Sequence, residues 1–261
     1  MSAAAHAAAA IIAACWSQAR KIQTLPAPLR PRTLEEGFLA QAALGSALDD
    51  RVIGWKLAAT AAPGQRHIGV DGPIPGRLFA QRVLADGSRA AMDGNRMRVA
   101  ECEFVFRLGR DLPAREREYG RDEVMAAVDS LHPGIELPDS RFDEFARAGA
   151  AQLAADNACA HWMVIGAAAS ADWRAVDLAA HGTCLRINGE EVSRGRGADV
   201  LGDPRDALTW LANRHALTGE GLRAGQFVTT GVTGTPSPSR EGERIEADLG
   251  VFGTVRASID G

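Results

Sequence analysis

The chain has 261 residues, and 46% of them are hydrophobic, which is enough for one sizeable core. Its formal net charge is −4 and no basic cluster stands beside an apolar run, so we expect no binding to nucleic acid or to a membrane surface. No segment combines the length and the apolar character of a membrane span.

The four cysteines point to a reducing compartment. Cys15, Cys102, Cys159 and Cys184 have no CxxC spacing, and three of them stand among apolar residues. Buried free thiols are therefore expected, rather than disulfides or a zinc site. This pattern predicts a cytoplasmic protein.

The first 50 residues predict a small helical region. The Ala-rich segment 3–21 has no Lys or Arg ahead of its apolar run, so we expect a helix rather than a signal peptide. A Pro-rich link follows at residues 25–31. Thr33 then predicts an N-cap, with Glu36 completing a capping box, for a helix that ends near Leu48. We expect residues 1–50 to precede a catalytic domain formed by residues 51–261.

Lys56 stands in an apolar run, residues 52–58, that predicts a buried strand. The chain has only one other lysine, Lys21, so a Lys inside this strand needs a reason. It is a candidate general acid or base, or a group that holds a substrate carboxylate. The alternative left open is a Lys at a strand end whose side chain reaches water. Burial would lower its pKa, and a nearby carboxylate would oppose that change.

The segment between Ala58 and Leu78 is rich in Gly and Pro, and it predicts a long irregular loop with a functional role. His67 in this loop is a candidate proton carrier, as is His161 further along, although a lone histidine is more often structural. Asp71 lies in Gly-Val-Asp-Gly, where ordinary turn chemistry is the simpler explanation.

The remaining sequence predicts an α+β fold with a strand-rich core. Short strand-like runs extend from Leu78 to Val99. The helices expected are 121–131, ended by His-Pro-Gly, a piece around 142–147, and 203–215. The strands expected are 135–137, 162–168, 183–192 with an Asn-Gly turn, 226–230, 244–248 and 251–259.

Two short polar segments have a functional and an ordinary interpretation. Thr230 and Gly231 close a predicted strand, and their backbone amides could hold an anion or a carboxylate, although an ordinary turn also explains them. Asp156-Asn157 joins two apolar segments, which indicates an N-cap.

The run from Met97 to Leu108 alternates like a strand and places Glu101 and Glu103 on one face. Two such carboxylates lie about 6.6 Å apart along the strand, and they repel unless a cation or a shared proton lies between them. With Glu136 as a third oxygen donor, the set suits Mg²⁺ or Mn²⁺. The alternative is the solvated face of an edge strand.

Seven motifs occur in an order that resembles the fumarylacetoacetate hydrolase superfamily, most closely its 2-keto-4-pentenoate hydratase and 4-oxalocrotonate decarboxylase branch. They are GWKLAAT (54–60), HIGVD (67–71), ECEFVF (101–106), GIELPDSR (134–141), ADNA (155–158), WLAN (210–213) and GVFG (250–253). The resemblance implies a mixed β-roll with flanking helices, a bound Mg²⁺ or Mn²⁺ and a homo-oligomer. Carried over by position, it implies Glu101, Glu103 and Glu136 as metal ligands and Lys56 as an active-site residue.

The resemblance also implies a reaction on a small 2-oxo or 2-hydroxy-dienoic acid, namely hydration of a 2-hydroxy-2,4-dienoate in aromatic-compound degradation. Decarboxylation of a 4-oxalocrotonate-like acid, or hydrolysis of an acylpyruvate, is the alternative at the same site. A binding protein without activity is a third. The family often has a second acid where this chain has Ile74. We therefore expect Asp71 or His67 to replace that acid beside Lys56, with Thr230 and Gly231 as substrate contacts.

Overall fold

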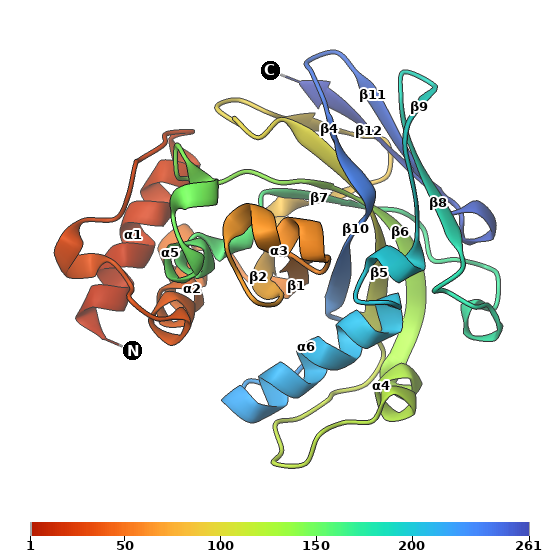
Figure 1. Cartoon of the computed structure of the whole chain (residues 1–261), viewed down its shortest axis with the longest axis horizontal. Helices are drawn as coiled ribbons and strands as arrows, with labels where there is room; N and C mark the ends of the chain where they lie inside the picture. The colour runs from red at the N-terminus through yellow and green to blue at the C-terminus, as the bar shows by residue number, and fades with distance from the viewer. Residues whose placement is uncertain (1, 261) are drawn as a thin grey trace.

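Two curved β-sheets form the centre of the molecule (Figure 1). The structure is a computed structural model, and it describes residues 2–260. In order across the larger sheet, the strands are β2 (Ile74–Phe79), β1 (Val52–Ala58), β10 (Phe227–Pro238), β5 (Val99–Leu108), β6 (Val128–Leu137), β7 (Trp162–Ile165) and β3 (Val83–Ala85). Those of the smaller sheet are β4 (Ser88–Ala91), β12 (Thr254–Asp260), β11 (Arg244–Asp248), β8 (Gly182–Ile187) and β9 (Glu190–Arg196).

The helices lie to one side of the sheets and below them in Figure 1, and this mixture of helices and strands confirms the predicted α+β class. They are α1 (Ala3–Ser17), α2 (Leu34–Leu48), α3 (Ala62–Ile68), α4 (Arg121–Ala127), α5 (Ala150–Ala155) and α6 (Pro204–Thr218). Short 3-10 turns lie at η1 (Ala27–Leu29), η2 (Ala80–Arg82), η3 (Phe145–Arg147), η4 (Asn157–Cys159), η5 (Trp173–Ala175), η6 (Gly197–Asp199) and η7 (Gly250–Phe252). None of the helices in the described part of the chain has the length and apolar character needed to cross a membrane.

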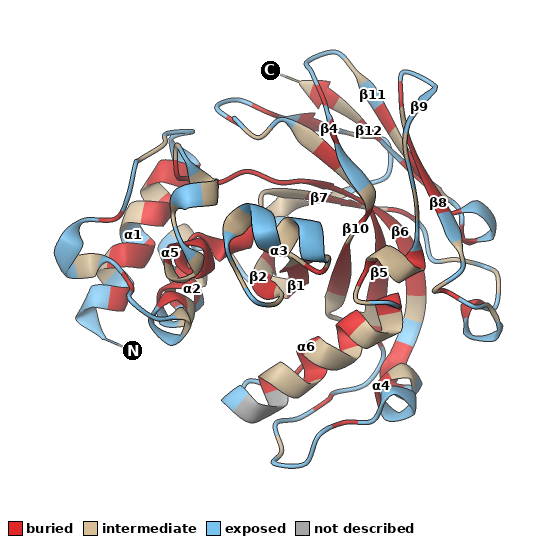
Figure 2. Ribbon diagram, in the orientation of Figure 1, coloured by how far each residue is buried: buried red, intermediate tan, exposed pale blue. Residues whose placement is uncertain are grey.

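The main core lies between the two sheets, where β5 and β6 face β11 and β12. Phe104 and Phe106 of β5 point into it, together with Leu185 and Val255 from the smaller sheet. The middle of the other face of β5 is buried as well, at Glu103 and Val105, and much of the central sheet is red in Figure 2. A polar side chain at the middle of that second face is therefore enclosed by protein.

The N-terminal helices pack on a second core that they share with the rest of the chain. Ile12 and Leu44 are fully buried there, against Phe79 at the end of β2 and Phe142 after β6. The helical region predicted for residues 1–50 is present, whereas the domain boundary at residue 50 stays a prediction. The capping box is altered: Thr33 Oγ1 accepts from Glu36 N at 3.3 Å, but Glu36 Oε2 accepts from Arg32 N rather than from Thr33 N.

Several predicted elements differ from the structure, three of them substantially. Part of the expected loop is helix α3, which has Pro63 in its first turn and Gly69 in the left-handed conformation at its end. The expected helix 121–131 ends at Ala127, where β6 begins. The strand expected to stop at Thr230 continues to Pro238.

Strand β6 runs through the His132-Pro133-Gly134 segment that suggested a break. Gly166 N donates to Pro133 O at 2.9 Å, and His132 Nδ1 lies 2.9 Å from Gly166 O. The histidine ring therefore contacts the acceptor that an N–H at position 133 would have used. A proline can stay in this strand because its missing donor is replaced by a neighbouring side chain.

All four cysteines are free and buried, as predicted. Burial raises the pKa of the Cys102 and Cys159 thiols to about 12. These thiols are therefore protonated at neutral pH and poor nucleophiles.

Candidate active site

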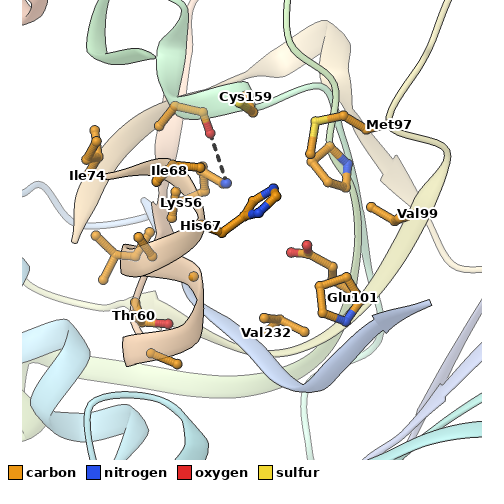
Figure 3. A pocket seen from close by; sticks show the side chains of 18 of the residues that line it. Lys56, Thr60, His67, Ile68, Ile74, Met97, Val99, Glu101, Cys159 and Val232 are labelled. Carbon is orange, nitrogen blue, oxygen red and sulfur yellow. Dashed lines mark hydrogen bonds between the residues drawn. The ribbon is translucent and has the colours of Figure 1, made fainter. Parts of the chain in front are cut away.

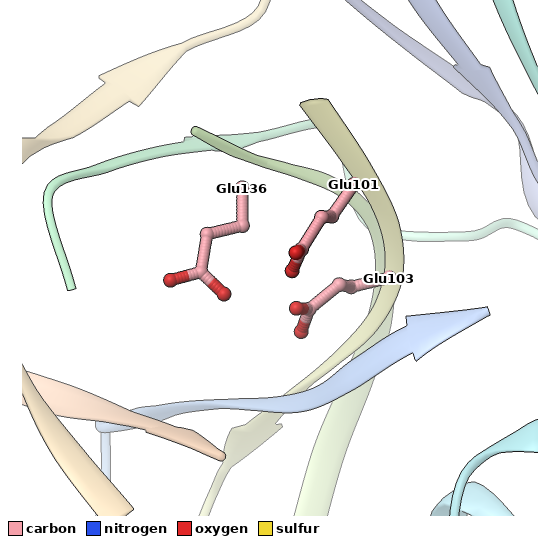
Figure 4. A group of neighbouring side chains, drawn as sticks. All are labelled: Glu101, Glu103 and Glu136. Atoms are coloured by element: carbon pink, nitrogen blue, oxygen red, sulfur yellow. The ribbon is translucent and has the colours of Figure 1, made fainter. Parts of the chain in front are cut away.

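Three glutamates converge on the buried second face of the larger sheet. Glu101 and Glu103 come from β5, and Glu136 of β6 lies directly opposite Glu101 in the strand register. One carboxylate oxygen from each lies within 4.8 Å of the others (Figure 4). Strand β5 has a neighbour on both sides and Glu103 has no exposed surface, so the solvated edge-strand alternative is wrong.

The backbone at Gly231 holds one of these carboxylates in place. The ladder between β10 and β5 is irregular here, and Gly231 adopts a φ of 104°. Its amide donates to Glu103 Oε2 at 2.8 Å. A Cβ at this position would lie 2.0 Å from Thr60 Oγ1, so the close approach requires glycine. Thr230 points elsewhere, and its hydroxyl donates to Phe104 O at 3.1 Å.

The carboxylates are electrostatically unfavourable without a cation. Burial and then the charge of Glu136 raise the pKa of Glu101 to about 8. Burial, followed by the charges of Glu136 and Glu101, raises the pKa of Glu103 well above its ordinary value. Like charges directly opposite each other in a sheet are destabilising, so this arrangement needs a compensating positive charge or a retained proton.

The donor atoms fit a hard divalent cation. Glu103 Oε1 and Glu136 Oε2 are buried and have no hydrogen-bond partner within residues 2–260. Unpaired buried oxygens are costly in a folded protein unless an ion or a water satisfies them. Three carboxylates supply the oxygen ligands that Mg²⁺ or Mn²⁺ prefers, and they leave room for further ligands.

Lys56 lies beside the glutamates and is 3% exposed, so the alternative of a side chain that reaches water is wrong. Its Nζ is 3.0 Å from Glu136 Oε1 and donates to Ala158 O at 3.1 Å. Burial acts to lower the pKa of Lys56, but Glu136, Glu101 and Glu103 together outweigh it and raise the pKa above its ordinary value. Lys56 is therefore an ammonium at neutral pH, suited to holding a carboxylate.

The carbonyl of Ala158 is aimed at Lys56 by a strained turn. Asn157, Ala158 and Cys159 all have positive φ, between 51° and 60°, a conformation that costs about 1–3 kcal/mol per non-glycine residue. Asn157 is fixed because its side chain accepts from Arg77 N and donates to Arg77 O. Such strain persists only where the surrounding structure imposes it.

The side chain of Asp156 ties the same turn to the segment that follows β6. It forms a buried ion pair with Arg141 and accepts a hydrogen bond from Ser140 Oγ at 2.6 Å. Asp156 does stand at the N-cap position of η4, as predicted, but its side chain makes no helix-capping hydrogen bond. The carboxylate instead ties the segment after Glu136 to the turn that contacts Lys56.

A cavity of about 330 Å³ opens above Lys56 and Glu101 (Figure 3). His67 of α3 points into it, and Ile74, at the position of the missing acid, is part of its wall. Asp71 is exposed and does not line the cavity, and Thr230 and Gly231 do not line it either. The structure does not place Asp71, Thr230 or Gly231 in the wall of the cavity. Their proposed roles in catalysis and substrate binding therefore stay predictions.

Several residues of the site were not identified from sequence. Met97, Phe145 and Leu153 line the cavity, but they carry no chemical signal that separates them from other apolar residues. Thr60 belongs to a motif already quoted, yet its contact with Gly231 depends on tertiary structure. His161 lies outside the cavity wall, where its Nδ1 accepts from Trp16 Nε1 at 2.9 Å.

The fold and the site define a class of protein: a curved α+β scaffold with three inward carboxylates and a lysine at the base of an apolar cavity. Residues 79–260 match the family model described as fumarylacetoacetate (FAA) hydrolase C-terminal. The chain therefore belongs to the fumarylacetoacetate hydrolase family, as the ordered motifs predicted.

Named relatives and a solved structure extend this assignment. The chain is 33% identical over 213 residues to a 2-keto-4-pentenoate hydratase of Paraburkholderia xenovorans (strain LB400), covering 82% of this chain and 78% of that protein. It is 32% identical over 259 residues to 2-keto-4-pentenoate hydratase 2 of Dechloromonas aromatica (strain RCB), covering 97% and 96%. The structure matches 4-oxalocrotonate decarboxylase from Pseudomonas putida G7, complexed with magnesium and adipate, with a TM-score of 0.88, 27% identity and coverage of 98% and 97%.

Proposed function

We propose that this protein is a metal-dependent hydratase of a 2-hydroxy-2,4-dienoate. The observation that carries the proposal is the group of three carboxylates within 4.8 Å, next to the Lys56 ammonium, at the base of a small-molecule cavity. Relatives at 33% and 32% identity named 2-keto-4-pentenoate hydratase support hydration as the reaction.

Glu101, Glu103 and Glu136 would hold Mg²⁺ or Mn²⁺, and the magnesium complexed with the matched decarboxylase supports this choice. A bound cation of this kind supplies Lewis acidity, which stabilises negative charge on the 2-oxygen of the substrate. Lys56 would hold the substrate carboxylate or protonate the dienol, because it is an ammonium that faces the cavity.

The reaction needs two proton movements. The 2-hydroxyl of the dienoate loses its proton and C5 gains one, which gives the 2-oxo-3-enoate. Water then adds its oxygen to C4, and one of its protons is delivered to C3. We assign His67 to this second transfer, because its imidazole points into the cavity and can accept and return a proton.

The test is turnover of 2-hydroxypenta-2,4-dienoate by the Mg²⁺-loaded protein, with the product identified by NMR as 4-hydroxy-2-oxopentanoate. Glu103→Gln should abolish turnover, and His67→Gln should reduce it by about 100-fold. His6→Gln, which replaces a histidine outside the cavity, is the matched control and should have no effect. An unchanged dienoate, including its longer analogues, would refute the proposal.

Decarboxylation is the second candidate, and the match to 4-oxalocrotonate decarboxylase favours it. The same carboxylates and lysine would serve, and only the bond that breaks would differ. Release of carbon dioxide from 2-oxohex-3-enedioate, without hydration of the dienoate, would establish this reaction instead.

We also propose that the protein works in the cytoplasm as a homo-oligomer. Its four unpaired, buried thiols support a reducing compartment. The proposal of assembly follows from the resemblance carried by the ordered motifs. Light scattering of the purified protein measures the assembly, and a mass equal to one 27.6 kDa chain would contradict it.

A further inference from the structure

We infer that the substrate is a monocarboxylic 2-oxo or 2-hydroxy acid with an apolar tail, and that the cavity excludes a second carboxylate at the far end. This inference rests on the proposed function only in taking the 2-oxo-acid end to be held at Glu101 and Lys56. It concerns the opposite end of the ligand, for which neither the metal site nor the lysine provides a contact.

The wall of the cavity separates charged groups from apolar ones. Lys56 and Glu101 lie at its base, beside the other two glutamates. The rest of the wall is mainly apolar, and its larger side chains include Ile68, Ile74, Met97, Val99, Phe145 and Leu153. A ligand held by its acid group at the base would therefore extend its tail between hydrocarbon surfaces.

The positions of the positively charged side chains support the exclusion of a diacid. The chain has 29 lysine and arginine residues, and among the described residues Lys56 is the one that lines this cavity. Lys56 already contacts Glu136 at 3.0 Å and Ala158 O at 3.1 Å. A second carboxylate would lose water on entering the apolar part and would gain no cation in return, which makes its burial unfavourable.

Ile74 gives the same indication. It is 2% exposed and lines the cavity with a sec-butyl group. This side chain offers no hydrogen bond to a second carboxylate and adds apolar surface beside the tail. His67 is the remaining wall residue that can carry positive charge, so its contribution must be measured separately.

Binding of unreactive 2-oxo acids to the Mg²⁺-loaded protein tests the inference without turnover. The probes are 2-oxobutanoate, 2-oxopentanoate, 2-oxohexanoate and 2-oxohexanedioate, measured by isothermal titration calorimetry. Affinity should rise about fourfold with each added methylene. The diacid, which differs from 2-oxohexanoate in its terminal group alone, should bind at least about tenfold more weakly. The same order should hold in His67→Gln.

A variant that adds a cation gives the complementary test. Met97→Lys should strengthen binding of 2-oxohexanedioate at least about tenfold and weaken that of 2-oxohexanoate. Met97→Leu is the matched control and should keep the wild-type order. The wild-type series decides the question if the lysine variant does not fold.

The outcomes separate this inference from the proposed reaction. Equal or tighter binding of the diacid by the wild-type protein would overturn the inference, even if the dienoate is hydrated. The predicted affinity order without any hydration would overturn the proposed reaction and leave the inference standing. If none of the four acids binds, the inference and the 2-oxo-acid site both fall.

Discussion

Replacing Glu101 by glutamine should stabilise the metal-free protein. The three carboxylate oxygens lie within 4.8 Å of one another, and at an effective dielectric constant of about 20 two unit charges at that distance repel by about 3 kcal/mol. Glutamine keeps the shape of the side chain and removes one charge. For a chain of this length, a gain of about 3 kcal/mol corresponds to a rise in Tm of about 6–12 °C.

The assay is thermal unfolding at pH 8 in EDTA and again in excess Mg²⁺. Ligand binding to the folded state raises the Tm, so Mg²⁺ should stabilise the wild-type protein and affect Glu101→Gln much less. Glu241→Gln, which changes an exposed glutamate, is the matched control and should follow the wild type in both conditions. A lower Tm for Glu101→Gln in EDTA, or an unchanged response to Mg²⁺, would refute the proposed role of the carboxylates.

The same variant has a defined pH dependence. The pKa of Glu101 is raised to about 8 in the folded protein, whereas a glutamate in an unfolded chain titrates near about 4.3. The folded state therefore retains a proton that the unfolded chain releases within this window. Without metal, stability should fall as the pH rises from about 4.3 to about 8, and this slope should be smaller in Glu101→Gln.

Three further outcomes are expected. Lys56→Met should lower kcat at least about 1000-fold while Mn²⁺ binding, followed by electron paramagnetic resonance, persists; full activity would exclude a role for the ammonium. Gly231→Ala should weaken Mg²⁺ binding in calorimetry, because its Cβ would displace Thr60 and disturb the amide that holds Glu103; unchanged affinity would contradict that role. Burial lowers the pKa of His215 to about 3, so the stability that its neutral form provides is present above pH 6.5 and lost as the pH falls toward 3. His215→Gln should reduce this acid-induced loss of Tm, and an identical acid profile would refute the reasoning.

The strand that carries Glu101 and Glu103 could be predicted from sequence, because its alternation is a local property of about ten residues. The same alternation placed Phe104 and Phe106 on the opposite, core-facing side. Glu136 could be named as a third oxygen donor, but the sequence alone did not place it beside the other two glutamates. Its position opposite Glu101 depends on strand register, which is a contact between residues 35 positions apart.

The errors arose where tertiary contacts override local signals. Pro133 indicated a break, yet β6 continues because the ring of His132 contacts the acceptor left by the missing N–H. Gly231 indicated a turn, yet it lies within β10, where its amide binds Glu103. Helix α3 is only seven residues long, too short to show the periodicity that identifies a helix.

The position of a bound ion would test the metal centre without relying on turnover. A crystal grown with Mn²⁺ and 2-oxohexanoate and measured near the manganese absorption edge would locate the metal by its anomalous scattering. We expect one strong peak with Glu101, Glu103 and Glu136 as its protein ligands. A peak elsewhere, or none among these three carboxylates, would contradict the assignment of these residues as the metal centre.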